Sequence, residues 1–136
     1  MISICDTGPL VAYLNRHDPH HDWAATVMAD VRPPALTCEA VLTEAAYFLR
    51  EDRLPVDPLF ALIERGALRV DFDMHAMWPR VRTLMARYER MDLADAVVVV
   101  MSERHSRCQV LTIDRKDFSV YRRNDRQVIP FVAPRD

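Results

Sequence analysis

The stretch Val110-Leu111-Thr112-Ile113-Asp114 carries the strongest strand signal in the chain, because a short apolar run that ends in a polar residue is typical of a buried strand. Residues 2–6, Ile-Ser-Ile-Cys-Asp, repeat this pattern at the start of the chain. In a parallel sheet the carboxyl ends of the strands meet at one edge, where ligands bind. We therefore expect Asp6 and Asp114 to lie at the same edge of a parallel sheet.

The remaining chain alternates short strands with helices. Further strands are expected over residues 35–38, 68–72 and 127–131, and helices from residue 9 and over 23–31, 39–53, 58–65, 75–89 and 94–107. This order predicts an α/β fold with a central, short-stranded, mainly parallel sheet flanked by helices. The sequence shows no repeat, low-complexity segment or linker, so we expect a single domain over residues 1–136.

Composition narrows the class of protein. The formal net charge of -2 argues against a protein that binds nucleic acid through bulk positive charge.

The three cysteines, Cys5, Cys38 and Cys108, are isolated, which favours buried free thiols and a reducing cytosol. We expect no signal peptide and no membrane span, because no apolar run reaches the roughly 18 residues that a span requires. With Gly8 and Gly66 as the only glycines, a glycine-rich nucleotide-binding loop is not expected.

Four acidic residues stand out by position, namely Asp6, Glu44, Asp95 and Asp114. Glu44 lies beside the apolar stripe of its predicted helix, and Asp95 opens an apolar helix that continues Ala-Val-Val-Val-Val. Each has an ordinary structural interpretation as a turn residue, a helix cap or an ion-pair partner. Together they predict a cluster of carboxylates, whose mutual repulsion a hard divalent cation usually relieves. This pattern favours a metal-dependent phosphodiester hydrolase.

These motifs, in this order, resemble the PIN domain (PilT N-terminus) family, and within it the VapC-type toxins of toxin–antitoxin pairs. The resemblance covers essentially the whole chain and rests on Ile-Cys-Asp6-Thr-Gly-Pro-Leu, Thr-Cys-Glu-Ala-Val-Leu-Thr-Glu44-Ala, Met-Asp92-Leu-Ala-Asp95-Ala-Val and Val-Leu-Thr-Ile-Asp114-Arg-Lys-Asp117-Phe. It implies a three-layer PIN-like domain that hydrolyses single-stranded or structured RNA with Mg²⁺ or Mn²⁺. It also implies a protein antitoxin, a homodimer and a cytoplasmic location.

The four acids are assigned different roles. We expect Asp6 and Asp95 to bind the metal directly, because Mg²⁺ usually takes one or two protein carboxylates and keeps several waters. Glu44 and Asp114 are expected to bind it directly or through those waters. Asp92 is an alternative to Asp95 as the third acid, and Asp95 is favoured because it heads the buried helix. Three residues are expected to assist, listed here in chain order: Thr7, Asp92 and Asp117.

A basic segment follows Asp114 and contains Arg115, Lys116, Arg122 and Arg123. Because guanidinium groups bind phosphate in a bidentate manner, this segment is a candidate path for the RNA backbone. A solvated face that balances acidic charge is the alternative. The antitoxin is expected to lay a segment that folds on binding across residues 39–65.

Two other functions remain open at this stage. The first is a catalytically silent PIN-like module that binds RNA or protein. The second is a receiver-like phosphoacceptor domain, which would need a lysine at the end of a late strand. The sequence argues against the second, because its only lysine, Lys116, lies beyond Asp114.

Overall fold

Five short strands form the central sheet of the computed structural model, which describes residues 1–135. Their spatial order is β3-β2-β1-β4-β7, and every neighbouring pair is parallel. The strands span Leu68–Val70 (β3), Ala35–Thr37 (β2), Ile2–Cys5 (β1), Cys108–Leu111 (β4) and Phe131–Val132 (β7). The predicted α/β class with a mainly parallel sheet is confirmed.

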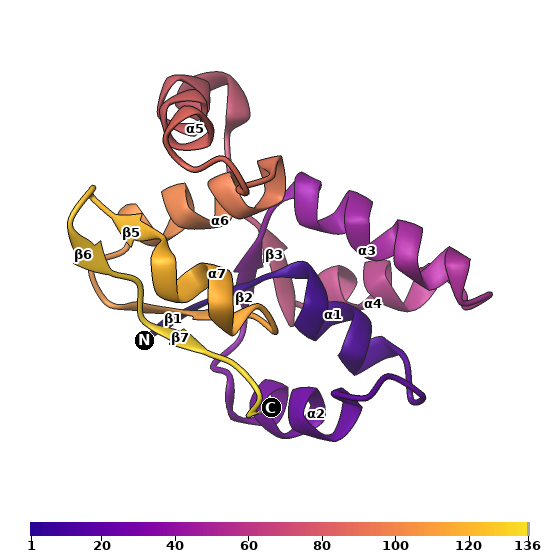
Figure 1. Cartoon of the computed structure of the whole chain (residues 1–136). Helices are drawn as coiled ribbons and strands as arrows, with labels where there is room; N and C mark the ends of the chain where they lie inside the picture. Colours follow the sequence, from indigo (N-terminus) through magenta and orange to yellow (C-terminus); the bar gives the residue numbers. More distant parts are fainter. Residues whose placement is uncertain (136) are drawn as a thin grey trace.

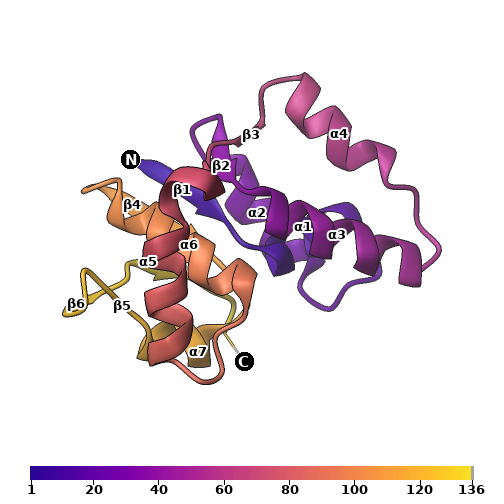
Figure 2. The same cartoon turned by 90° about the horizontal axis from the view of Figure 1, so that it is seen from above.

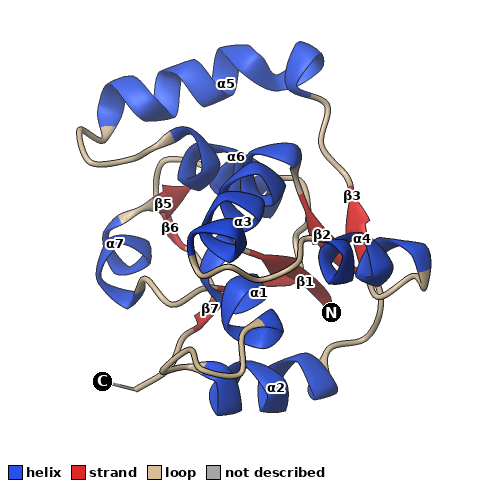
Figure 3. Cartoon of the chain, turned by 90° about the vertical axis from the view of Figure 1, so that its right-hand side faces the viewer, coloured by secondary structure: helices blue, strands red, loops and turns tan. Residues whose placement is uncertain are grey.

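Pairs of helices connect successive strands of this sheet (Figure 1). They are α1 (Thr7–Leu14) and α2 (His21–Asp30) after β1, α3 (Glu39–Glu51) and α4 (Asp57–Glu64) after β2, and α5 (Met74–Arg87) and α6 (Leu93–Glu103) after β3. Helices α5 and α6 lie on one side of the sheet and α2 lies on the other (Figures 1 and 3). Seen from above, α5 lies over α6 (Figure 2), so α6 is enclosed between α5 and the strands.

Burial on all sides explains the composition of α6. The run from Ala96 to Ser102 is buried throughout, as expected for a helix that contacts β1, β4, α3 and α5. Asp92 caps this helix, because its side chain accepts a hydrogen bond from the Asp95 backbone N–H. Asp95 therefore lies in the first turn, the part of α6 that reaches the edge of the sheet.

The register of β1 and β4 brings two of the predicted acids together. Cys5 pairs with Leu111, and the Asp6 backbone N–H donates to the Leu111 carbonyl across 2.9 Å. Asp6 and Thr112 are therefore the first residues beyond the ends of two adjacent strands. The expected placement of Asp6 and Asp114 at one edge of the sheet follows from this register.

The structure differs from the sequence-based expectations after residue 114. A short helix, α7 (Arg115–Val120), was not predicted, and Asp114 caps it by accepting from the Asp117 N–H. The strand predicted over 127–131 was wrong as a single element. It divides into β6 (Gln127–Val128), which pairs with β5 (Arg122–Arg123) in an antiparallel hairpin, and β7 of the main sheet.

Two local features account for that division. Asn124 and Asp125 adopt positive φ angles of 51° and 66°, which suit a tight hairpin turn and place β6 against β5. Pro130 then follows, and it lacks the N–H that a continuous strand would donate.

Among residues 1–135, no helix combines the length and apolar character needed to cross a bilayer.

Candidate active site

All four predicted acids line one pocket of about 410 Å³, called the acidic pocket below. Seven carboxylates border it, and Gly8, Val11, Phe48 and Ile113 supply much of the remaining lining. The seven are Asp6, Asp18, Glu44, Asp52, Asp92, Asp95 and Asp114. No arginine or lysine of residues 1–135 is among the residues that line this pocket. A concentration of negative charge without a lining cation is therefore the defining property of the site.

Asp6 is buried at the end of β1, and both of its carboxylate oxygens accept hydrogen bonds. Oδ1 accepts from the Thr7 backbone N–H at 2.9 Å, and Oδ2 accepts from the Thr112 hydroxyl at 2.8 Å. Burial is the main cause that raises the pKa of Asp6, the two hydrogen bonds oppose the rise, the charges of Glu44 and Asp92 add to it, and the resulting pKa is about 6. Asp6 is thus fixed in orientation and holds its proton more tightly than an exposed aspartate.

Glu44 reaches the acidic pocket from α3 and is held by Thr7. The Thr7 hydroxyl donates to Glu44 Oε1 across 2.6 Å, while the backbone N–H of the same residue binds Asp6. Thr7 is buried, so its hydroxyl has little access to solvent. One threonine therefore orients two of the four acids, which gives the auxiliary role predicted for Thr7 a specific geometry.

Asp95 extends into the pocket from the first turn of α6. Its Oδ2 accepts a hydrogen bond from the Tyr121 hydroxyl at 2.8 Å. Burial is the main cause that raises the pKa of Asp95, the Tyr121 hydrogen bond opposes the rise, the charges of Asp6, Asp92 and Asp114 add to it, and the resulting pKa is about 7. Asp92 also lines the pocket, but its Oδ1 is engaged by the Asp95 backbone N–H at 2.8 Å.

Asp114 borders the pocket from the loop between β4 and α7. Its backbone N–H donates to the Thr112 hydroxyl, and its Oδ1 accepts from the Asp117 N–H, both at 3.0 Å. Burial raises the pKa of Asp114, and the neighbouring Asp117 raises it further. Arg90 acts in the opposite direction, and its guanidinium lies 3.8 Å from Asp117 Oδ1. Asp117 lies next to Asp114 but is not among the residues that line the pocket, and its auxiliary role stays a prediction.

The basic segment after Asp114 is mostly engaged in the fold. Arg115 donates to the Ala133 carbonyl at 2.9 Å, and Arg122 donates to three carbonyls at the end of α7. Arg123 is buried, donates to the His105 carbonyl at 2.9 Å and leaves its Nε without a partner. An RNA contact by this segment stays a prediction, and Lys116 is exposed and available for it.

The donors in the acidic pocket fit a hard divalent cation. Carboxylate oxygens are the ligands that Mg²⁺ and Mn²⁺ prefer, and no lysine or arginine of residues 1–135 lines the pocket to compensate their charge. Within residues 1–135, no three or more histidine, cysteine or acidic side chains converge closely enough to hold a metal ion among them. Mg²⁺ commonly binds to one or two carboxylates and retains its waters, so an open arrangement of this kind suits it.

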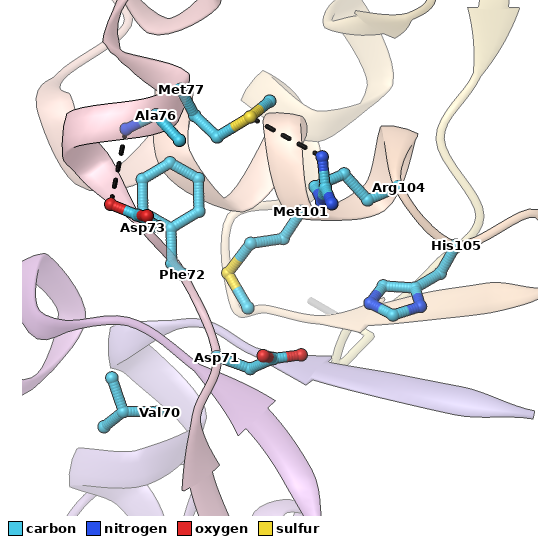
Figure 4. Close-up of a pocket in the computed structure, with 9 residues that line it drawn as sticks. All are labelled: Val70, Asp71, Phe72, Asp73, Ala76, Met77, Met101, Arg104 and His105. Atoms are coloured by element: carbon cyan, nitrogen blue, oxygen red, sulfur yellow. Dashed lines mark hydrogen bonds between the residues drawn. The ribbon is translucent and has the colours of Figure 1, made fainter.

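A larger pocket, of about 530 Å³, lies between the β3–α5 connection and the end of α6 (Figure 4). It contains none of the four predicted acids. Asp73 there caps α5 through the Ala76 N–H, and the Arg104 guanidinium lies 3.5 Å from the Met77 sulfur. Its two aspartates, Asp71 and Asp73, share the pocket with Arg104, whose guanidinium offsets part of the negative charge there. The smaller acidic pocket, which all four predicted acids line, is therefore the candidate active site.

Sequence reasoning missed two residues that orient the acids, Thr112 and Tyr121. Thr112 interrupts the apolar run 110–113, and a polar residue at the end of a buried strand was a usable signal. Tyr121 lies 26 residues beyond its partner Asp95, and no local pattern connects the two. It follows α7, the helix that the sequence did not predict.

Comparison with known proteins places this arrangement in a family. Residues 3–124 match the sequence model of the PIN domain. Ribonuclease VapC26 of Mycobacterium tuberculosis (strain ATCC 25618 / H37Rv) is 28% identical over 124 residues, which cover 88% of this chain and 91% of that protein. The crystal structure of Mycobacterium tuberculosis VapC20, a sarcin–ricin loop cleaving toxin, has a similar fold, with a TM-score of 0.75 at 20% identity over 94% of this chain and 99% of that one. The predicted resemblance to VapC-type proteins is confirmed, and the chain belongs to the PIN domain family.

Proposed function

We propose that this protein is a Mg²⁺- or Mn²⁺-dependent endoribonuclease that acts as the toxin of a toxin–antitoxin pair in the cytoplasm. The observation that carries the proposal is the meeting of Asp6, Glu44, Asp95 and Asp114 at one pocket that no lysine or arginine of residues 1–135 lines. The similarity to a protein named ribonuclease VapC26 supports RNA as the substrate. The three buried free thiols are compatible with a reducing compartment.

Asp6 and Asp95 would hold the metal directly, with Glu44 and Asp114 binding it directly or through water. The bound ion would supply Lewis-acid polarisation of the scissile phosphate and a lowered pKa for water, which together favour hydrolysis at neutral pH. Asp6 and Asp95, with pKa values of about 6 and about 7, must release their protons to serve as ligands. Activity is therefore expected to rise with pH across this range.

The remaining residues of the site fix the geometry. Thr7 and Thr112 occupy both oxygens of Asp6, and Tyr121 occupies one oxygen of Asp95. Because these donors are already in place, the carboxylates need little reorganisation when a cation and a phosphate arrive. Glu44, held by Thr7, would bind the ion directly or through water with its carboxylate already oriented.

The deciding experiment is cleavage of single-stranded and structured RNAs by the purified chain in Mg²⁺, Mn²⁺ or EDTA. We expect cleavage in either metal and none in EDTA or with the Asp6→Asn protein. Phe60→Ala is a matched control, since Phe60 is exposed on α4 outside the acidic pocket. Metal-independent cleavage, or full activity of Asp6→Asn, would contradict the proposal. Complete inactivity on every RNA would favour the non-catalytic binding module.

The antitoxin is proposed to cover α3 and α4. Tyr47 and Phe60, each 59% exposed, offer apolar contacts on these two helices. An acidic pocket beside them would attract a basic side chain from the partner, which would block metal binding. Expression from the native operon should yield a stoichiometric complex with a small protein. Harmless expression of this chain alone, without such a partner, would count against a toxin.

A homodimer is proposed through α5. Met74, Trp78 and Met85 are 37%, 49% and 37% exposed on this helix, an unusual density of large apolar side chains in water. Light scattering after size-exclusion chromatography should give the mass of a dimer for the wild type and of a monomer for Trp78→Ser. Phe60→Ser, a change at an exposed aromatic on another helix, should remain dimeric. A monomeric wild type would refute this interface.

A further inference from the structure

We infer that Phe48 forms a subsite for an unpaired nucleobase of the substrate beside the carboxylates. This inference rests on the proposed ribonuclease function and goes beyond it by naming a residue that binds the RNA. Phe48 lies four residues after Glu44 on α3, one turn along the same face of the helix. Its ring is 47% exposed and lines the acidic pocket together with Glu44.

A second apolar side chain extends this surface from another element. Ile113 is 42% exposed, directly precedes Asp114 and also lines the pocket. Gly8 permits its position, because a Cβ atom at Gly8 would lie 2.4 Å from the Ile113 Cγ1 atom. Each of two predicted acids, Glu44 and Asp114, thus has a large exposed apolar side chain close to it in the chain and in the same pocket.

The ring of Phe48 is supported from the side. Tyr47 makes an edge-on contact with it, with a distance of 5.4 Å between ring centroids and 73° between ring planes. The Tyr47 hydroxyl donates to Glu51 Oε1 at 3.3 Å. An aromatic ring held in this manner offers a surface for stacking at a small cost in side-chain entropy.

Electrostatics favours a base as the occupant. Seven carboxylates border the pocket and repel phosphate groups, while the whole chain carries a formal net charge of -2. Binding of RNA therefore needs contacts that negative charge does not oppose. Stacking of a neutral base on an aromatic ring is such a contact, and it strengthens binding of single strands by roughly 5- to 150-fold per base. The position of Phe48 inside the acidic pocket favours the substrate over a protein partner as its ligand.

The first test compares cleavage kinetics of four proteins on a single-stranded RNA with Mn²⁺. For Phe48→Ala we expect KM to rise by roughly 5- to 150-fold with a much smaller change in kcat, because the lost contact binds a base remote from the reacting phosphate. Phe48→Trp should stay near the wild type, since it preserves an aromatic surface. Val128→Ala, which shortens a 64% exposed apolar side chain on β6 outside the acidic pocket, should match the wild type.

The second test detects stacking without cleavage. It uses Asp114→Asn, which keeps Asp6 and Asp95, and a short oligoadenylate that contains one 2-aminopurine. Stacking on Phe48 should quench the 2-aminopurine fluorescence at saturation, and adding Phe48→Ala should abolish the quenching. Unchanged KM and unchanged fluorescence in the Phe48→Ala proteins would overturn the inference. So would a Phe48→Ala protein that cleaves normally and only loses its antitoxin.

The two proposals fail in different ways. A wild-type protein that cleaves no RNA refutes the ribonuclease proposal, while the fluorescence measurement still decides whether a base stacks on Phe48. A wild type that cleaves with metal, together with a Phe48→Ala protein of normal KM and normal quenching, refutes the base subsite alone.

Discussion

Tyr121 donates its hydroxyl to Asp95 Oδ2 across 2.8 Å and so joins the end of α7 to the first turn of α6. Its ring is buried and packs edge-on against Phe118 and Tyr88, with centroid distances of 5.3 Å and 5.2 Å. Burial and the adjacent Asp95 raise the pKa of Tyr121, so its hydroxyl remains protonated and remains a donor. Asp95 thus depends for its orientation on a residue far away in the sequence.

Tyr121→Phe is expected to lower kcat/KM for RNA by roughly 10-fold or more at neutral pH, the usual cost of losing a hydrogen bond to a charged group. The hydrogen bond lowers the pKa of Asp95, so its loss should also move the acidic limb of the activity profile to higher pH. The measurement is kcat/KM across a pH series in Mn²⁺.

Tyr88→Phe supplies the control for this change. The Tyr88 hydroxyl accepts from the Arg122 backbone N–H at 3.1 Å and belongs to the same aromatic cluster, but it does not contact an acid of the site. Tyr88→Phe should leave the pH profile of kcat/KM unchanged. Identical profiles for the two variants would show that Tyr121 only supports the fold.

The acids of the site were predictable because each has a local signature. Asp6 and Asp114 end apolar runs, and Asp95 precedes a run of valines, so their positions follow from strand and helix patterns alone. Their supporting donors were not predictable in the same way. Tyr121 reaches Asp95 through tertiary packing, which sequence periodicity does not record.

The fold likewise contains some elements that the local sequence determines and others that depend on tertiary contacts. Helix α3 begins at Glu39 as expected, and α5 begins at Met74, one residue before its expected start, because the Asp73 side chain caps it. Helix α7, after residue 114, was not predicted, because a six-residue helix has too few turns to show a periodic apolar pattern. The residues before Pro130 pair in a hairpin and those after it pair in the main sheet, a division that depends on where their partner strands lie.

The choice between Asp92 and Asp95 as the third acid leads to the second prediction. Asp95→Asn should abolish RNA cleavage, because it removes a charge that faces Asp6 and Asp114. Asp92→Asn should retain most of the activity, since asparagine caps a helix about as well as aspartate and preserves the bond to the Asp95 N–H. Circular dichroism would verify that both proteins are folded. Normal cleavage by Asp95→Asn with inactive Asp92→Asn would reverse the assignment.

The third prediction concerns Thr7. Thr7→Val removes the hydroxyl that holds Glu44 at 2.6 Å but keeps the backbone N–H that binds Asp6. We expect kcat to fall by roughly 10-fold, as for the loss of one hydrogen bond to a carboxylate. Thr7→Ser, which restores a hydroxyl at the same position, should recover most of the rate. Equal kcat values for the valine and serine variants would mean that the hydroxyl has no role in catalysis.

The last prediction links protons, metal and stability. A carboxyl whose pKa is raised in the folded protein binds its proton more tightly there than in the unfolded chain. The stabilisation that this proton provides is complete below the unfolded pKa and is lost as pH rises through the folded pKa. For Asp6 and Asp95 the window runs from the ordinary value of 3.8 up to about 6 and about 7, respectively. The metal-free protein should therefore lose thermal stability across that interval.

Added metal should reverse this loss, because cation binding removes the repulsion that ionisation creates. At about pH 8 in low salt, Mn²⁺ should raise the melting temperature above its value in EDTA, by the equivalent of about 2.7 kcal/mol when free metal exceeds its dissociation constant a hundredfold. At about pH 5 the rise should shrink, since protons compete for the same oxygens.

Asp95→Asn separates the two effects. Without its charge, the metal-free variant should melt at a higher temperature than the wild type at about pH 8 and should differ less from it at about pH 5. Its response to Mn²⁺ should be smaller, because a proposed ligand is gone. Asn can still accept the Tyr121 hydrogen bond through its amide oxygen, so the packing around α7 is preserved. A melting temperature that is the same in EDTA and Mn²⁺, with no decline between about pH 4 and about pH 7, would refute the assignment of these acids as a metal site.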